Sequence, residues 1–143
     1  VLIPNLTKVF TLSKQERLKS RKLIEQLFRE GKSIAVFPYR VLYLPVNDAD
    51  IRLPATLQSG VAVSSKHFKK AVHRNKIKRL TREAYRLQKA GLQQKLTEAG
   101  QQLILFLIYT GKEIPDFLLV KEKVQVILEK LIHRIDESHP PHT

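Results

Sequence analysis

Sulfur chemistry is absent from this chain of 143 residues, which has no cysteine and no methionine. Without cysteine there is no disulfide framework, no thiolate metal site and no thiol catalysis. Long apolar runs are missing as well: none approaches the roughly 18 residues that a membrane-spanning helix needs. The opening segment, VLIPNLTKVF, lacks the charged start and the small-residue cleavage site of a secretory signal. We therefore expect a cytoplasmic protein with no membrane partner.

Acidic residues are also scarce. Thirteen Asp and Glu stand against 26 Lys and Arg, which gives a formal net charge of +13. This imbalance predicts an anionic partner. A hydrophobic fraction of 43% suits a folded chain, and the length suits one domain. We expect that domain over residues 13–136, between an extended arm (1–12) and a disordered tail (137–143).

The positive charge is concentrated between residues 66 and 89, in the stretch KHFKKAVHRNKIKRLTREAYRLQK. These residues hold ten Lys or Arg and a single acid, Glu83. From about Arg74 the apolar residues recur at helical spacing, so one arc faces a core and the opposite arc stays outside. The outer arc consists of Arg74, Asn75, Lys78, Arg79, Arg82, Tyr85, Arg86 and Lys89.

Two interpretations of this basic arc compete. Charged helix faces are usually just solvated, but they then interleave both signs at i,i+4 spacing, where opposite charges attract. Here Arg74, Lys78, Arg82 and Arg86 repeat one sign at that spacing. A polyphosphate partner explains this better, and nucleic acid is favoured. Anionic lipid is a weaker candidate, because the core face has short side chains rather than bulky membrane-inserting ones.

An apolar stripe at helical spacing predicts a helix before residue 31. The stripe consists of Leu23, Ile24, Leu27 and Phe28. Two starts compete, since Ser13 and Glu16 form a capping box while Ser20 could cap a shorter helix. Gly31 is placed to end the helix in a left-handed conformation.

Three later segments have the pattern of strands. Residues 39–44 alternate after the interruption at Pro38, and residues 60–64 (GVAVS) lead directly into the basic stretch. Residues 103–109 (LILFLIY) are continuously apolar, as in a strand buried on both faces. Residues 46–58 predict a loop.

Helices surround the last of these strands. The segment 90–101 continues helically after a break, and Asp116 can cap a final helix. The order of elements predicts an α/β two-layer sandwich, with a small mixed sheet and about three helices.

No residue set for protein-based catalysis or metal binding is evident. Nuclease chemistry would need convergent carboxylates or a histidine base. Asp48 and Asp50 lie in the predicted loop, and Glu83 is flanked by arginines. The five histidines lack paired metal-ligand spacing. We therefore expect no catalytic residue and no metal ligand in the protein.

Two segments carry a resemblance to a known family. GVAVSSKHFKKAVHRNKIKRLTREAYR closely resembles the signature of the bacterial ribonuclease P protein subunit, in which a strand leads into K-A-V-x-R-N-R-x-K-R-x-x-R-E. The earlier RLKSRKLIEQLFREGKSIA resembles that family's first helix and the strand after it. Together the two segments cover about half of the chain, in the expected order and spacing.

The resemblance implies a function. It implies an α/β sandwich with a left-handed βαβ crossover. It also implies that the protein is the RNA-binding accessory subunit of a ribonucleoprotein endonuclease, which removes the 5′ leader from precursor tRNA. The catalytic centre would belong to the ribonuclease P RNA, with magnesium required by the holoenzyme and no cofactor on the protein. The expected partners are that RNA and the leader, and no protein partner is implied.

The resemblance also implies site residues. The motif positions, with the flanking cations, form the expected RNA-binding set: Lys66, Lys70, Arg74, Asn75, Lys76, Lys78, Arg79, Arg82 and Arg86. A cleft between the first helix and the sheet would hold the single-stranded leader, at positions Ile24, Phe28 and Tyr43. With the helix lying across the sheet, Phe28 and Tyr43 are expected to face each other.

The chain departs from the family pattern at two of these positions. Lys76 replaces an arginine and loses its planar fork, and Ile24 replaces an aromatic residue that could stack on a base. Composition alone leaves a second function open, that of a structural RNA-binding protein of the ribosomal type with no enzyme attached. The motif following the GVAVS strand favours the ribonuclease P subunit.

Overall fold

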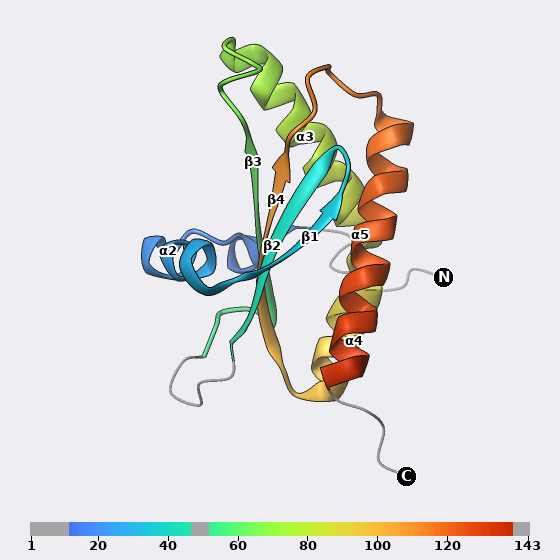
Figure 1. Ribbon diagram of the computed structural model, residues 1–143. Helices are drawn as coiled ribbons and strands as arrows, with labels where there is room; N and C mark the ends of the chain where they lie inside the picture. Colours follow the sequence, from blue (N-terminus) through green and yellow to red (C-terminus); the bar gives the residue numbers. More distant parts are fainter. Residues whose placement is uncertain (1–11, 47–51, 139–143) are drawn as a thin grey trace, which may run out of the picture.

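A four-stranded mixed sheet organises the fold in the computed structural model of the protein, which describes residues 12–46 and 52–138 (Figure 1). The elements, in chain order, are η1 (Lys14–Glu16), α2 (Arg21–Glu30), β1 (Lys32–Val36), β2 (Tyr39–Val46), β3 (Leu57–Val63), α3 (Ala71–Gln88), α4 (Ala90–Ala99), β4 (Gln102–Tyr109) and α5 (Phe117–Ser138).

The sheet has the order β1-β2-β4-β3. β1 and β2 form a hairpin whose two-residue turn is Phe37–Pro38, so Pro38 lies in a turn rather than at a bulge. β4 pairs antiparallel with β2 and parallel with β3. It is therefore an inner strand, as its continuous apolar run predicts.

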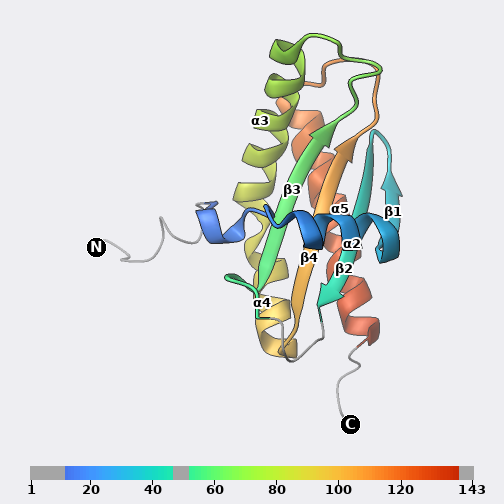
Figure 2. The same ribbon diagram turned by 90° about the vertical axis from the view of Figure 1, so that its left-hand side faces the viewer.

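The connection from β3 to β4 is left-handed. In Figure 2 both strands point upward and β4 lies to the right of β3, while the chain between them passes behind the sheet through α3 and α4. Parallel strands are joined in the right-handed sense in about 98% of cases. This uncommon crossover, expected from the family resemblance, is confirmed.

Helices cover both faces of the sheet (Figure 1). Leu103, Leu105 and Leu107 of β4 join the main core beneath α3, α4 and α5. Ile104 and the alternate residues after it join a smaller core beneath α2. The α/β class is confirmed, but α2 adds a partial layer to the expected two, and the described residues form four α-helices where about three were expected.

The two candidate helix starts are both used. Ser13 and Glu16 form their capping box around η1, whereas Ser20 caps α2 by accepting a 3.3 Å hydrogen bond from the Leu23 amide. The expected left-handed end at Gly31 is wrong, because its φ of −66° is ordinary. Glycine is needed there for another reason: a Cβ atom would lie 2.3 Å from the Leu27 carbonyl oxygen.

Lys89 marks the junction between α3 and α4. Sequence analysis placed it on the outer arc of the basic helix, but its side chain is only 1% exposed. Its ammonium group forms an ion pair with Glu16, which also accepts a hydrogen bond from Gln93 at 2.6 Å. A helical pattern shows only which residues share a face. It cannot show that one cation of the arc is buried because a carboxylate distant in sequence pairs with it.

The predicted domain limits are only partly covered by the structure. Of the expected arm, residues 1–11 lie outside the described residues, as do 139–143 of the expected tail. α5 continues through Ser138, so residues 137 and 138, which were expected in the tail, are helical. Of the predicted loop at 46–58, residue 46 belongs to β2 and residues 57 and 58 belong to β3, while 47–51 lie outside the described residues.

We predict that the Glu16–Lys89 pair is a major determinant of stability. Glu16→Gln should lower the free energy of unfolding by about 3 kcal/mol, because it leaves a buried ammonium without its counter-ion. Combining it with Lys89→Met should cost less than the sum of the two single changes. Denaturant unfolding measures both, and Glu25→Gln, which breaks the exposed 3.4 Å pair with Arg21, is the control.

The same pair predicts a dependence on pH. Burial alone would raise the pKa of Glu16, but hydrogen bonds from Lys89 and from the Ser13 amide outweigh burial and lower it. A lowered carboxyl pKa stabilises the fold above the unfolded-state pKa of about 4.3, and this contribution disappears as the pH falls through the folded-state value. The double variant should therefore lose less stability on acidification than the wild type. If the wild type and the double variant lost equal stability on acidification, the assignment of a lowered pKa to Glu16 would be contradicted.

Candidate nucleic-acid interface

The outer face of α3 carries exposed cations in a regular row. Lys76, Arg79 and Arg82 are exposed, and Lys78 beside them is half-buried. On the inner side of the helix, Ile77 is fully buried in the core. The predicted division of this helix into a core face and a cationic face is confirmed except at Tyr85 and Lys89, which were expected on the outer arc and are buried.

The segment before α3 adds further positive charge. Lys66 and Lys70 are exposed there, and Asn75 is exposed in the second turn of α3. Phe68 is buried and packs against Tyr109, with 6.1 Å between the ring centroids. This anchor directs the neighbouring lysines toward solvent.

Arg74 lies in the same region but differs from the other motif residues, because its guanidinium group is hydrogen-bonded within the protein. Its Nη1 atom donates to the carbonyl oxygens of Phe68 at 2.6 Å and of Lys69 at 2.8 Å. The guanidinium group thus fastens the loop to the helix. Arg74 still contributes positive charge, but it donates these hydrogen bonds to the protein backbone.

Arg86 is also engaged within the helix. Its Nη2 atom lies 2.5 Å from Oε1 of Glu83, and its Nε atom donates to the second carboxylate oxygen at 3.1 Å. The hydrogen bond with Arg86 lowers the pKa of Glu83. The positive charge on this last turn of α3 is therefore partly compensated.

The structure separates the residues expected in the leader cleft. Phe28 projects from α2 and is 53% exposed, with its ring 5.6 Å from that of Phe106. Tyr43 is only 4% exposed and lies on the other face of the sheet, where its hydroxyl oxygen accepts a 2.9 Å hydrogen bond from Arg134. The expectation that Phe28 faces Tyr43 is wrong.

Strand alternation explains this error. Neighbouring residues of a strand point to opposite faces, so a one-residue difference in register reverses the side. Leu42 of β2 faces α2 instead, with Leu44 and Val46 of the same strand, and packs in one cluster with Ile24 of that helix. Phe106 completes this surface, and sequence reasoning missed it because a continuous apolar run does not indicate which residues face which helix.

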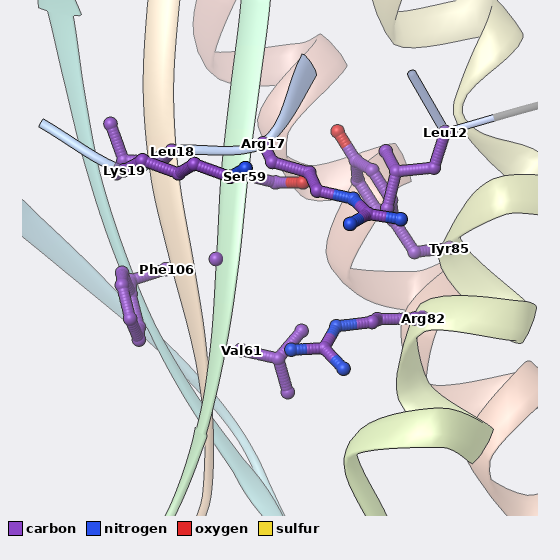
Figure 3. A pocket seen from close by; sticks show the side chains of 10 residues that line it. Leu12, Arg17, Leu18, Lys19, Ser59, Val61, Arg82, Tyr85 and Phe106 are labelled. Carbon is purple, nitrogen blue, oxygen red and sulfur yellow. The ribbon is translucent and has the colours of Figure 1, made fainter. Parts of the chain in front are cut away.

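A pocket of about 240 Å³ opens at the outer edge of β3 (Figure 3). Arg17 and Lys19, which follow η1, line it together with Arg82 of α3. Sequence analysis did not select Arg17 or Lys19, because they lie far from the motif in the chain. The pocket lies next to Phe106, at the border between the α2 face and the cationic row of α3.

The described residues include no group of three or more histidine, aspartate or glutamate side chains that could hold a metal ion. No helix in the described part of the chain is long and apolar enough to cross a membrane.

Fold and site together define a class of protein: a small α+β RNA-binding protein with a cationic helix beside an aromatic sheet surface. The Ribonuclease P family model matches residues 12–132. The ribonuclease P protein component of Porphyromonas gingivalis is 37% identical over 129 residues, which cover 90% of this chain and 92% of that protein.

Solved structures agree with this match. The RNase P protein of Thermotoga maritima has a TM-score of 0.60 and 28% identity, covering 80% of this chain and 96% of that one. The Staphylococcus aureus RNase P protein shares the fold, with a TM-score of 0.61 at 22% identity over 80% of this chain and 94% of that one. The chain belongs to the ribonuclease P protein family, and the ribosomal alternative is not favoured.

We predict that Arg74 and Arg79 differ in their effect on stability. Arg74→Gln should lower the free energy of unfolding by about 1–2 kcal/mol, because two charged hydrogen bonds to the loop are lost. Arg79→Gln removes an exposed charge and should change stability by less than about 0.5 kcal/mol. Thermal melts of the two variants provide the comparison. An equal effect would show that the Arg74 contacts do not hold the loop.

Proposed function

We propose that this protein binds the ribonuclease P RNA through α3 and the loop before it, and the 5′ leader of precursor tRNA across the α2 face. The observation that carries the proposal is the row of exposed cations Lys76, Arg79 and Arg82, none of which has an acidic partner among the described residues. A regular cationic row on a rigid helix suits the phosphates of a folded RNA.

The same arrangement supports a catalytic centre in the RNA. Hydrolysis of a phosphodiester needs a group that activates water or metal ions that do so. Glu83, the single acidic residue within α3, is held by Arg86. The protein therefore contributes positioning and charge, and we assign the magnesium of the holoenzyme to the RNA.

Leader binding is supported by the pair Phe28 and Phe106. The half-exposed ring of Phe28 on α2 offers a flat apolar face to an unpaired base beside Phe106 of β4, and such stacking does not depend on base identity. Phe28 takes the position of a family aromatic, whereas Phe106 replaces Tyr43 in the proposed site. Ile24 widens the apolar surface but cannot stack as a ring does.

Reconstitution tests this function. The protein alone should cleave no RNA, whereas with a bacterial ribonuclease P RNA and magnesium it should support removal of the 5′ leader at low magnesium.

A variant with Lys76, Arg79 and Arg82 changed to Gln should bind that RNA more weakly. The slope of log affinity against log salt concentration should fall by about 0.9 for each lost duplex phosphate contact. The matched control changes Lys121, Lys123 and Lys130 of α5. Cleavage by RNA-free protein would overturn the accessory role, and equal losses from both triple variants would leave a non-specific polycation.

A second prediction concerns the leader. Phe28→Ala should weaken holoenzyme binding of leader-bearing precursor tRNA by about 1–3 kcal/mol if one base stacks there, and leave binding of mature tRNA unchanged. Because Phe28 is half-exposed, the variant should keep its fold, which a thermal melt checks. Tyr43→Phe, which removes only the hydroxyl that Arg134 contacts, should leave the precursor-to-mature ratio unchanged. A ratio unaffected by Phe28→Ala would remove this ring from the leader site.

A further inference from the structure

Another pocket lies at the end of the sheet where β1 turns into β2. Its volume is about 560 Å³, and pockets of about 300–1,000 Å³ are the usual size for small ligands. Tyr109, which belongs to the main core, and Leu119 of α5 line it together with the β1–β2 turn. The pocket therefore lies on the α5 side of the sheet and is separate from the α2 face, to which the leader is assigned.

Apolar side chains are exposed at this pocket. Of the six large apolar side chains that are exposed in the described part of the chain, Phe37, Ile114 and Leu119 line it. Phe37, in the β1–β2 turn, is 78% exposed. Exposed apolar surface that is gathered in one place marks a site of interaction.

Hydrogen bonds fix the walls of the pocket in advance of any ligand. The Thr110 amide and hydroxyl both donate to the Pro38 carbonyl oxygen, at 2.8 and 3.0 Å. The Tyr109 hydroxyl donates to the Glu113 carbonyl oxygen at 2.5 Å. Phe37 therefore projects from a turn that is tied to its neighbours, and little conformational freedom is lost when its ring is covered.

The charges around the pocket balance each other. Lys112 and Lys123 line it, and so do Glu113 and Asp116. The Asp116 carboxylate also caps α5 by accepting a 2.8 Å hydrogen bond from the Leu119 amide. Because both signs are equally represented, the pocket does not attract phosphate as the cationic row of α3 does. It suits an uncharged, flat and largely apolar group.

The pocket adjoins the surface proposed to bind the ribonuclease P RNA. The β1–β2 turn, the segment from β4 to α5 and the segment before α3 lie at the same end of the sheet (Figures 1 and 2). Tyr109 connects them, because it lines the pocket and its ring packs against Phe68 of the segment before α3. The exposed cations Lys66 and Lys70 lie on either side of Phe68 in the chain. RNA bound to these cations therefore lies at the same end of the molecule as Phe37.

We propose that this pocket binds one unpaired base of the ribonuclease P RNA, stacked on the exposed face of Phe37. The inference rests on the proposed function, since the same RNA occupies α3 and the segment before it. Stacking of a base on an aromatic ring needs no charge and no particular base, which agrees with the balanced charges of the pocket. A second copy of this chain is a less suitable occupant, because two proteins of net charge +13 repel each other.

The affinity of the full chain for a bacterial ribonuclease P RNA tests this contact. Phe37→Ala should weaken binding about tenfold, within the range for one stacked base, whereas Phe37→Tyr keeps a ring and should bind as the wild type does. The slope of log affinity against log salt concentration should stay the same for Phe37→Ala, since no phosphate contact is lost. Leu118→Ala is the matched control, because Leu118 is as exposed as Phe37 but does not line the pocket. An equal loss of affinity in the control, or a shallower slope for Phe37→Ala, would contradict stacking at Phe37.

A direct readout is available because the chain has no tryptophan. Phe37→Trp introduces a single indole, and its fluorescence should be quenched when the RNA binds and a base stacks on the ring. Leu118→Trp is the control and should keep its fluorescence. Quenching in both variants, or in neither, would overturn the inference.

The outcomes separate this inference from the proposed function. If changing Lys76, Arg79 and Arg82 to Gln leaves RNA binding unchanged, the proposed function itself fails. If that triple variant binds weakly but Phe37→Ala binds as tightly as the wild type, the stacked base alone is excluded. Sedimentation equilibrium of the RNA-free protein examines the other occupant: a dimer that Phe37→Ala dissociates would assign the pocket to a second copy and overturn the inference. Because Phe37 is exposed, its variants should fold, and a thermal melt verifies this.

Discussion

A single buried ammonium group, that of Lys89, constrains much of this structure. Removing a charge from water costs several kcal/mol unless a counter-ion and further hydrogen bonds compensate. Glu16 provides the counter-ion from a segment more than 70 residues earlier in the chain. The N-terminal segment must therefore dock at the junction of α3 and α4, and that docking places Arg17 beside β3. One ion pair links the N-terminal segment, both helices and the edge of the sheet.

In α3 the residues that stabilise the helix are different from those proposed to bind RNA. Its like charges at i,i+4 spacing oppose helix formation, so α3 depends on its inner face. Ile77 and Ala84 are fully buried there, and Thr81 bonds the Tyr39 hydroxyl at 2.7 Å. Because packing fixes the helix, its outer cations are already in position when RNA arrives, and less conformational freedom is lost on binding.

Sequence patterns predicted some site residues and not others, for identifiable reasons. Helical period placed Arg79 and Arg82 on the exposed face of α3, and the family motif added Lys76. The partner of Arg74 is a backbone carbonyl of the preceding loop, which no side-chain pattern encodes. Phe106 faces α2 because of its place in a strand that is apolar on both sides, and the failure to place Tyr43 has the same origin.

By itself the sequence determined the charge, most helices and strands, and through its motif the family. These depend on local spacing, because a helix or strand repeats within a few residues. Tertiary structure alone decided which face of the sheet each aromatic occupies, that Lys89 is buried, and that Arg17 lies beside Arg82. Such relations join residues far apart in the chain, and they depend on the register of strands and on the left-handed path from β3 to β4. A periodic pattern contains no information about that path.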